Sequence, residues 1–138
     1  MAAPASNVRV LVVDDSLSFR EAAHGLLDDT AGFEWIGEAS RGEDAVEQTA
    51  RLRPDLVLMD VRMPGIGGVE AARRIAARPS PSIVVLVTGA DLPIDVPPAT
   101  AADILPKHRL NPASLRQLWE HHHSDTAQRA TTLPGAPD

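Results

Sequence analysis

Strand-length apolar runs rich in β-branched residues alternate with segments of helical spacing, and this alternation constrains the fold more than any other feature. Val8 to Val13 is a largely apolar run only as long as a strand, which is typical of a strand covered on both faces of its sheet. From Ser16, a good N-cap, apolar residues recur at helical spacing. Further strand-like runs lie at 33–39, 56–59, 83–87 and 104–105, and further helical segments at 42–52, 69–76 and from Asn111-Pro112 onward.

This order of elements predicts an α/β fold in three layers, a doubly wound parallel sheet of five strands with helices on both faces, because each right-handed crossover carries the chain back over the sheet. A length of 138 residues suits one domain. We expect a disordered lead-in over 1–7, the domain over 8–123, and a flexible tail over 124–138, where Thr, Ala and Pro offer no apolar face to bury.

The segment from Asp91 to Ala102 departs from the regular alternation. It contains Pro93, Pro97 and Pro98, and proline inside a helix removes an amide donor and clashes with the preceding turn. The helix expected between the fourth and fifth strands is therefore predicted to be short or degenerate, with a turn or two at most.

Charge and residue usage narrow the classes of function. The formal net charge of -6 disfavours direct binding to a nucleic-acid backbone. The chain has no cysteine, which excludes disulfides and thiolate chemistry and is compatible with a reducing cytoplasm. No apolar run approaches the roughly 20 residues that span a bilayer, and the first residues do not resemble a signal peptide. We therefore expect a cytoplasmic protein without a membrane contact.

Polar side chains of unusual type follow the ends of four predicted strands. Asp14 and Asp15 follow the first strand, Asp60 the third, Thr88 the fourth and Lys107 the fifth. Each alone is an ordinary strand-ending residue, but ligands of open α/β sheets bind at the carboxyl ends of the strands. The set of five therefore predicts one pocket at that edge.

The chemistry of this predicted pocket is that of phosphoryl transfer. Three crowded carboxylates without His or Cys favour a hard cation, and Mg²⁺ fits best, with Mn²⁺ as a substitute. One carboxylate then stays available as a nucleophile toward phosphorus, and Asp60 is the candidate. Lys107 can neutralise charge on the phosphoryl oxygens, and the Thr88 hydroxyl can donate a hydrogen bond to one of them.

Two motifs resemble those of the response-regulator receivers. The segment Leu11 to Ser16 (LVVDDS) is similar to the acidic opening of that family, and Pro54 to Gly68 (PDLVLMDVRMPGIGG) is similar to its phosphoacceptor segment. The resemblance covers roughly residues 8 to 121. It implies the flavodoxin-like receiver fold with strand order 2-1-3-4-5, which would make the four strands that carry the polar residues neighbours.

The resemblance also implies roles for the site residues. Asp60 would accept a phosphoryl group from a sensor histidine kinase or a phosphotransfer protein. Asp15, Asp60 and the backbone carbonyl of Arg62 would bind the metal, with Asp14 nearby or acting through water. Thr88 and Lys107 would be the switch hydroxyl and the lysine that senses phosphate. The expected activity is limited to self-phosphorylation and autodephosphorylation, so the chain is not expected to be an enzyme in any other sense.

The sequence departs from the family pattern after Thr88. Ile104 stands where the family often has an aromatic switch residue, and His108 stands where a proline often follows the lysine. Ile104, Gly89 and Ala90 are candidate modulators of the site. These changes indicate an intact site with an altered output surface.

Several alternatives stay open at this point. The chain could be the receiver portion of a DNA-binding transcriptional regulator, or a pseudo-receiver that acts without phosphorylation. An aspartyl-nucleophile phosphatase would need a second aspartate two residues after the nucleophile. Arg62 stands there, which counts strongly against such an enzyme. The output partner is unidentified, and a homodimer is a further expectation.

Overall fold

The strands and helices lie close to the predicted ranges. The computed structural model describes residues 7–79, 82–89, 96–97 and 100–131, with the side chains described as far as residue 123. The strands are β1 (Val8–Val13), β2 (Phe33–Ala39), β3 (Leu56–Asp60), β4 (Ile83–Thr88) and β5 (Asp103–Pro106). The helices are α1 (Leu17–Asp28), α2 (Gly42–Leu52), α3 (Gly67–Ala76) and α4 (Pro112–Thr131), and a short 3-10 helix, η1 (Lys107–Arg109), follows β5.

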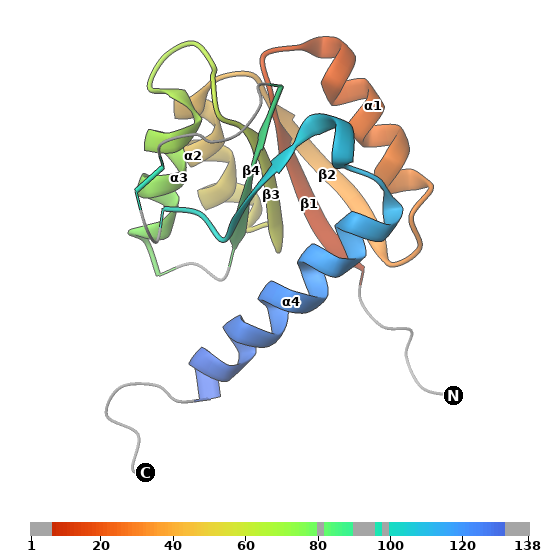
Figure 1. Ribbon diagram of the computed structural model, residues 1–138. Coiled ribbons are helices and arrows are strands. Elements are labelled where there is room, and N and C mark those ends of the chain that lie inside the picture. Colours follow the sequence, from red (N-terminus) through yellow and green to blue (C-terminus); the bar gives the residue numbers. More distant parts are fainter. Residues whose placement is uncertain (1–6, 80–81, 90–95, 98–99, 132–138) are drawn as a thin grey trace.

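The five strands form one parallel sheet in the order β2-β1-β3-β4-β5. Helices α2 and α3 cover one face of this sheet, and α1 and the first part of α4 lie on the other (Figure 1). The predicted three-layer α/β fold and its strand order are thus confirmed. A parallel sheet places the carboxyl ends of all its strands at one edge, and this edge carries the site described below.

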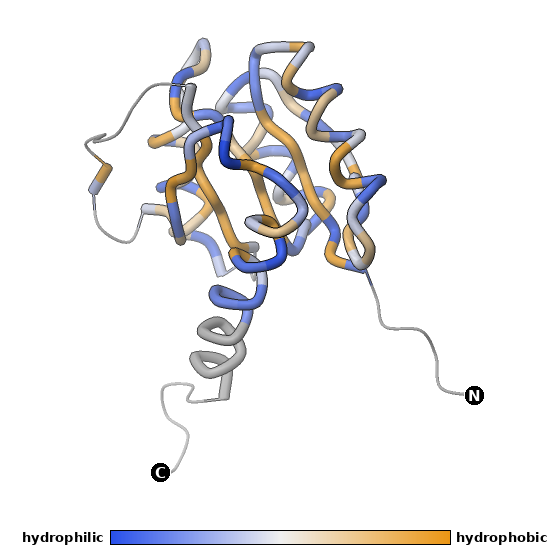
Figure 2. Tube along the Cα trace, turned by 45° about the vertical axis from the view of Figure 1, so that its right-hand side comes forward, coloured by the Kyte–Doolittle hydropathy of each residue, from blue (hydrophilic) through white to orange (hydrophobic). Residues whose placement is uncertain are grey.

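Burial on both faces explains why the central strands are almost purely apolar. Every residue of β3 and β4 is buried, and Figure 2 shows that the hydrophobic parts of the chain concentrate in the strands. One apolar cluster joins the sheet to α2 and α3 and includes Val46 and Ile75. A second joins the sheet to α1 and α4 through Leu27 and Leu115. Because both faces of the central strands are covered, β3 and β4 lack the alternation of a half-exposed strand, whereas the edge strand β2 exposes Glu34 and Glu38.

Side-chain caps fix the beginnings of two helices. The Ser16 hydroxyl accepts a hydrogen bond from the amide of Phe19, as its N-cap position predicts. At the start of α4, the Asn111 side chain accepts from the Ser114 amide at 2.9 Å, while the Ser114 hydroxyl accepts from the Asn111 amide at 3.0 Å. This reciprocal pair is a capping box, and it confirms the predicted helix start at Asn111-Pro112.

The structure differs from the prediction at the C-terminal end of the chain. The expected flexible tail began at residue 124, but α4 continues to Thr131. The tail prediction relied on the absence of an apolar face, and a helix backbone needs no such face, because its hydrogen bonds form within the segment. The remainder of the predicted tail, 132–138, and the predicted lead-in over 1–6 lie outside the described residues.

The connection between β4 and β5 contains no helix among its described residues, which are Gly89, 96–97 and 100–102. The expectation of a short or degenerate helix falls mainly on residues 90–95 and 98–99, outside the described part of the chain. Val96 and Ala101 pack against the cluster on the α3 side of the sheet.

Candidate functional site

The five polar residues that follow the strands all lie at the carboxyl-end edge of the sheet. Asp14 and Asp15 come directly after β1, Asp60 and Thr88 are the last residues of β3 and β4, and Lys107 comes directly after β5. These four strands are consecutive in the sheet. The three carboxylates each offer an oxygen, and these oxygens lie within 4.8 Å of one another.

Asp14 lies at the bottom of this acidic group. Its side chain is fully buried, and the Asp14 carboxylate accepts a hydrogen bond from the Ser16 amide at 2.8 Å. The other carboxylate oxygen of Asp14 lies 2.6 Å from the Lys107 ammonium. Asp15, by contrast, is exposed at the mouth of the group. The two neighbouring aspartates therefore occupy different environments, one inside the protein and one open to solvent.

Asp60 lies between Asp14 and the loop that leads into α3. Its side chain is 10% exposed, and one carboxylate oxygen lies 3.5 Å from the Lys107 ammonium. Burial raises the pKa of Asp60, and the nearby Asp14 charge raises it further, while Lys107 and the Arg62 amide oppose these effects without cancelling them. The carboxylate is thus held where its negative charge is poorly solvated.

Lys107 is the cation of the site. Its ammonium contacts Asp14 and Asp60 and lies 4.6 Å from the centre of the Phe19 ring, in cation–π geometry. Burial alone would lower the pKa of Lys107, but the hydrogen bond to Asp14 and the charges of Asp60 and Asp14 together raise it above its ordinary value. Lys107 therefore stays charged at neutral pH.

The remaining predicted site residues surround this centre. Thr88 is buried at the end of β4. The preceding residue, Val87, accepts a hydrogen bond at its carbonyl from the amide of Val61, the residue after Asp60. Arg62 is exposed in the loop after Asp60. Among the candidate modulators, Gly89 is exposed and Ile104 packs partly buried against the cluster on the α3 side. Ala90 lies outside the described residues.

The chemistry of these side chains fits a hard divalent cation. The ligand atoms that converge are all carboxylate oxygens, which Mg²⁺ and Mn²⁺ prefer over nitrogen or sulfur ligands. The crowding also fits, because Asp60 keeps a raised pKa even with the Lys107 ammonium in place. An additional positive charge would relieve the remaining repulsion between the carboxylates.

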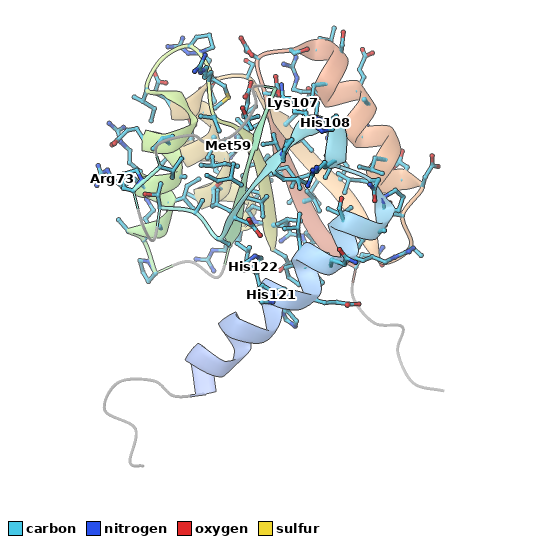
Figure 3. The ribbon with its side chains drawn as sticks, viewed as in Figure 1. Met59, Arg73, Lys107, His108, His121 and His122 are labelled. Carbon is cyan, nitrogen blue, oxygen red and sulfur yellow. The ribbon has the colours of Figure 1, made fainter. Side chains whose placement is uncertain are left out.

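The histidines near the C-terminal end do not belong to this site. Figure 3 shows Lys107 and His108 at the upper edge of the sheet, whereas His121 and His122 lie at the opposite, lower side of the molecule. His122 contacts Asp103 at 3.2 Å there. The consecutive histidines thus contribute nothing to the carboxylate group.

Two residues of α1 contact the site although the sequence pattern did not single them out. Phe19 supplies the ring beneath Lys107, and Arg20 donates to the backbone carbonyl of Asp14 at 2.6 Å and to the Glu38 carboxylate. Phe19 is one of the apolar residues that recur at helical spacing after Ser16. Their place in the sequence could have identified them. Because α1 begins two residues after Asp15, its first turn must lie beside the carboxyl ends of the strands.

Comparison with known proteins now assigns the family. A family model describing the response regulator receiver domain matches residues 10–120. The chain belongs to this family. The match confirms the resemblance predicted from the acidic and phosphoacceptor segments. It does not favour the alternatives, a DNA-binding regulator or a pseudo-receiver, over a phosphorylatable receiver.

Relatives and solved structures agree with this assignment. The receiver is 42% identical over 104 residues to a protein-glutamate methylesterase/protein-glutamine glutaminase of Alkalilimnicola ehrlichii, covering 72% of this chain and 27% of that protein. It is 46% identical over 80 residues to the response regulator GacA of Pseudomonas aeruginosa, covering 58% of this chain and 37% of GacA. The chain thus spans well under half the length of these curated relatives.

Among solved structures, the response regulator domain of Thermotoga maritima CheB superposes on the receiver with a TM-score of 0.65 at 28% identity, covering 93% of this chain and 99% of that one. The signal receiver domain of NarL from Mycobacterium tuberculosis gives 0.71 at 28% identity, covering 91% and 100%. In the described part of the receiver, no helix has the length and apolar character needed to cross a membrane.

Proposed function

We propose that this receiver accepts a phosphoryl group on Asp60 and, as a result, changes its contacts with a partner protein. The observation that carries the proposal is the placement of a poorly solvated Asp60 carboxylate beside two other carboxylates, with the Lys107 ammonium 3.5 Å away. This arrangement offers a nucleophile, an oxygen-rich cation site and a positive charge at one sheet edge. Phosphoryl transfer requires these three elements together.

In the proposed reaction, a carboxylate oxygen of Asp60 attacks the phosphorus of a phosphohistidine on a sensor kinase or a phosphotransfer protein. The new O–P bond forms as the N–P bond breaks, and the histidine nitrogen leaves with the bonding electron pair and takes up a proton. An Mg²⁺ ion held at the carboxylates would neutralise negative charge on the phosphoryl oxygens. Asp15, Asp60 and the Arg62 carbonyl would hold this ion, with Asp14 acting next to it or through water.

Lys107 and Thr88 respond to the new charge in this proposal. An aspartyl phosphate adds close to two negative charges, by analogy with other phosphorylated side chains. Lys107 would exchange its contact with Asp60 for one with the phosphoryl group, and the Thr88 hydroxyl would donate a hydrogen bond to it. Thr88 ends β4 and Lys107 follows the neighbouring strand β5, so their movement would reach Gly89, Ala90 and Ile104 and alter the output surface.

The same proposal covers the catalysis, the partners and the location of this receiver. The chain would act as a phosphoacceptor switch, with self-phosphorylation and autodephosphorylation as its only catalysis, in contrast to the activities named for its longer relatives. Its partners would be a histidine kinase or phosphotransfer protein and an output protein or a second copy of the chain. The location would be cytoplasmic, with which the absence of cysteine is compatible.

Intact mass after incubation with acetyl phosphate tests the proposal. We expect one phosphoryl adduct on the natural chain in the presence of Mg²⁺, no adduct after chelation, and none on Asp60→Asn under either condition. Asp55→Asn serves as the matched control, because Asp55 binds the Arg9 amide at the opposite edge of the sheet. Failure of the natural chain to take up phosphate would favour a receiver that signals by binding alone.

A further inference from the structure

The loop between β3 and α3, residues 61–66, rests against the first turn of α2. A Cβ on Gly42 would lie 2.6 Å from the Ile66 side chain and 2.7 Å from the Gly67 carbonyl, distances that real Cβ contacts do not show. Gly65, with φ of 83°, passes so close to Glu43 that a Cβ there would overlap the carboxylate. Two glycines thus permit a direct contact between loop and helix.

Glu43 makes the polar part of this contact. One of its carboxylate oxygens accepts a hydrogen bond from the Ile66 amide at 3.0 Å, and the other lies 3.0 Å from the Arg41 guanidinium. The hydrogen bond from the Ile66 backbone is the main reason that the pKa of Glu43 lies below its ordinary value. Glu43 therefore stays ionised at neutral pH and keeps its acceptor.

The backbone amide of Ile66 needs an acceptor from another element, because Ile66 lies at the start of α3. It is the N-cap residue of α3, and its side chain makes no capping hydrogen bond. The first amides of a helix have no partners within the helix, and a negative charge near them is favourable. Glu43 supplies from α2 an acceptor for the Ile66 amide and a negative charge near the start of α3.

The contact bears on the site because the loop is short and begins at Asp60. Its far end is held by the hydrogen bond from the Gly68 amide to the Val61 carbonyl at 3.0 Å. The Arg62 amide bonds only weakly to Asp60, at 3.3 Å. Glu43, from α2, holds the α3 end of the loop by accepting the hydrogen bond from the Ile66 amide.

We propose that Glu43 is a positioning residue, which holds the 61–66 loop in the conformation that presents the Arg62 carbonyl beside Asp15 and Asp60. This inference rests on the proposed phosphoryl acceptance and adds a residue to which the sequence pattern gave no role. Glu43 itself touches neither metal nor phosphate. It acts through the loop backbone, as the outer partners of metal ligands do.

The test compares Glu43→Ala, Glu43→Gln and Asp44→Ala with the natural chain. Gln keeps an oxygen that can accept from the Ile66 amide but loses the charge, and Ala loses both. Asp44 is the matched control, because it lies in the same turn of α2, is exposed, and carries the same charge. Glu43 is 42% exposed, so its truncation leaves no core cavity and the variants are expected to fold.

Two measurements follow on each protein. Amide hydrogen exchange at Ile66 in metal-free protein reports the anchor directly, and calorimetric titration with MgCl₂ reports the site. We expect Glu43→Ala to exchange faster at Ile66 and to bind Mg²⁺ on the order of 10-fold more weakly, at the low end of the range for such outer partners. Glu43→Gln should recover most of both properties, and Asp44→Ala should match the natural chain.

The proposal is overturned by three results. Mg²⁺ affinity of Glu43→Ala within about twofold of the natural chain would show that the loop does not need the anchor. An equal loss in Asp44→Ala would assign the effect to charge at the helix terminus, and an equal loss in Glu43→Gln would exclude the hydrogen bond as its cause. If the natural chain takes up no phosphate, the proposed function fails, but the exchange rate at Ile66 still decides whether Glu43 holds the loop.

Discussion

Asp60 carries a negative charge that the folded chain balances only in part. Burial and the neighbouring Asp14 raise its pKa, and Lys107 does not fully offset them. A carboxyl group whose pKa is higher in the folded than in the unfolded chain loses stability as the pH rises from the unfolded value to the folded one. The Asp60 charge therefore weakens the metal-free fold above that pH range.

Asp60→Asn is expected to stabilise the metal-free protein at neutral pH by on the order of 1 kcal/mol, because it removes a buried and incompletely satisfied charge. The gain should shrink as the pH falls through the raised pKa toward the ordinary value of 3.8, where the natural carboxyl is also neutral. Urea unfolding of both proteins at several pH values measures this difference in the free energy of unfolding. Asp15→Asn is the control and should change stability less, because Asp15 is exposed. An unstable Asp60→Asn protein at neutral pH would contradict this account.

Single residues differed in how well their roles could be predicted. Asp14, Asp60 and Lys107 could be predicted as a set, because charged residues at the ends of several parallel strands come together at the carboxyl-end edge of the sheet. Phe19 and Glu43 do not stand out, because a helical pattern already accounts for an apolar and an acidic residue at those positions. Their contacts depend on how α1 and α2 lie against the strand ends, which periodicity does not specify.

At the scale of elements, burial explains what could be predicted. The strands β1 and β2 begin and end where the apolar pattern predicted, and β3 and β4 each run one residue further, to Asp60 and Thr88. The pattern did not predict the helical residues after 123, because the sequence there has no apolar face at helical spacing. The strand order came from the family resemblance, since alternation alone does not say which strands are neighbours.

The capping box of α4 permits a direct test at this scale. Asn111→Ala and Ser114→Ala should each lower the free energy of unfolding by about 1 kcal/mol, because each leaves amides at the helix start without their acceptor. Since the two hydrogen bonds are reciprocal, the double variant should lose less than the sum of the single losses. Chemical denaturation of the four proteins measures this coupling. Strict additivity would show that the two side chains act independently.

For the whole molecule, the two apolar clusters define which part of the chain is needed for folding. Their described members extend no further along the chain than Trp119. A chain ending at His123 should therefore unfold in urea within about 0.5 kcal/mol of the full chain, the range expected for changes away from the core. A substantially larger loss would show that residues 124–138 contribute packing, and the proposed domain boundary at 123 would then be wrong.

The Lys107 ammonium, lodged between Asp14 and Asp60, gives the metal-free receiver a built-in counter-ion. Uptake of Mg²⁺ would then be an exchange of cations, in which a divalent ion enters a group of carboxylates that the Lys107 ammonium already neutralises in part. Such a site would set a threshold on free magnesium, because the incoming ion must compete with an ammonium that is covalently tethered beside the carboxylates. The same tether would keep a cation beside a newly formed aspartyl phosphate, so the residue that opposes metal binding would also be the one that neutralises the product.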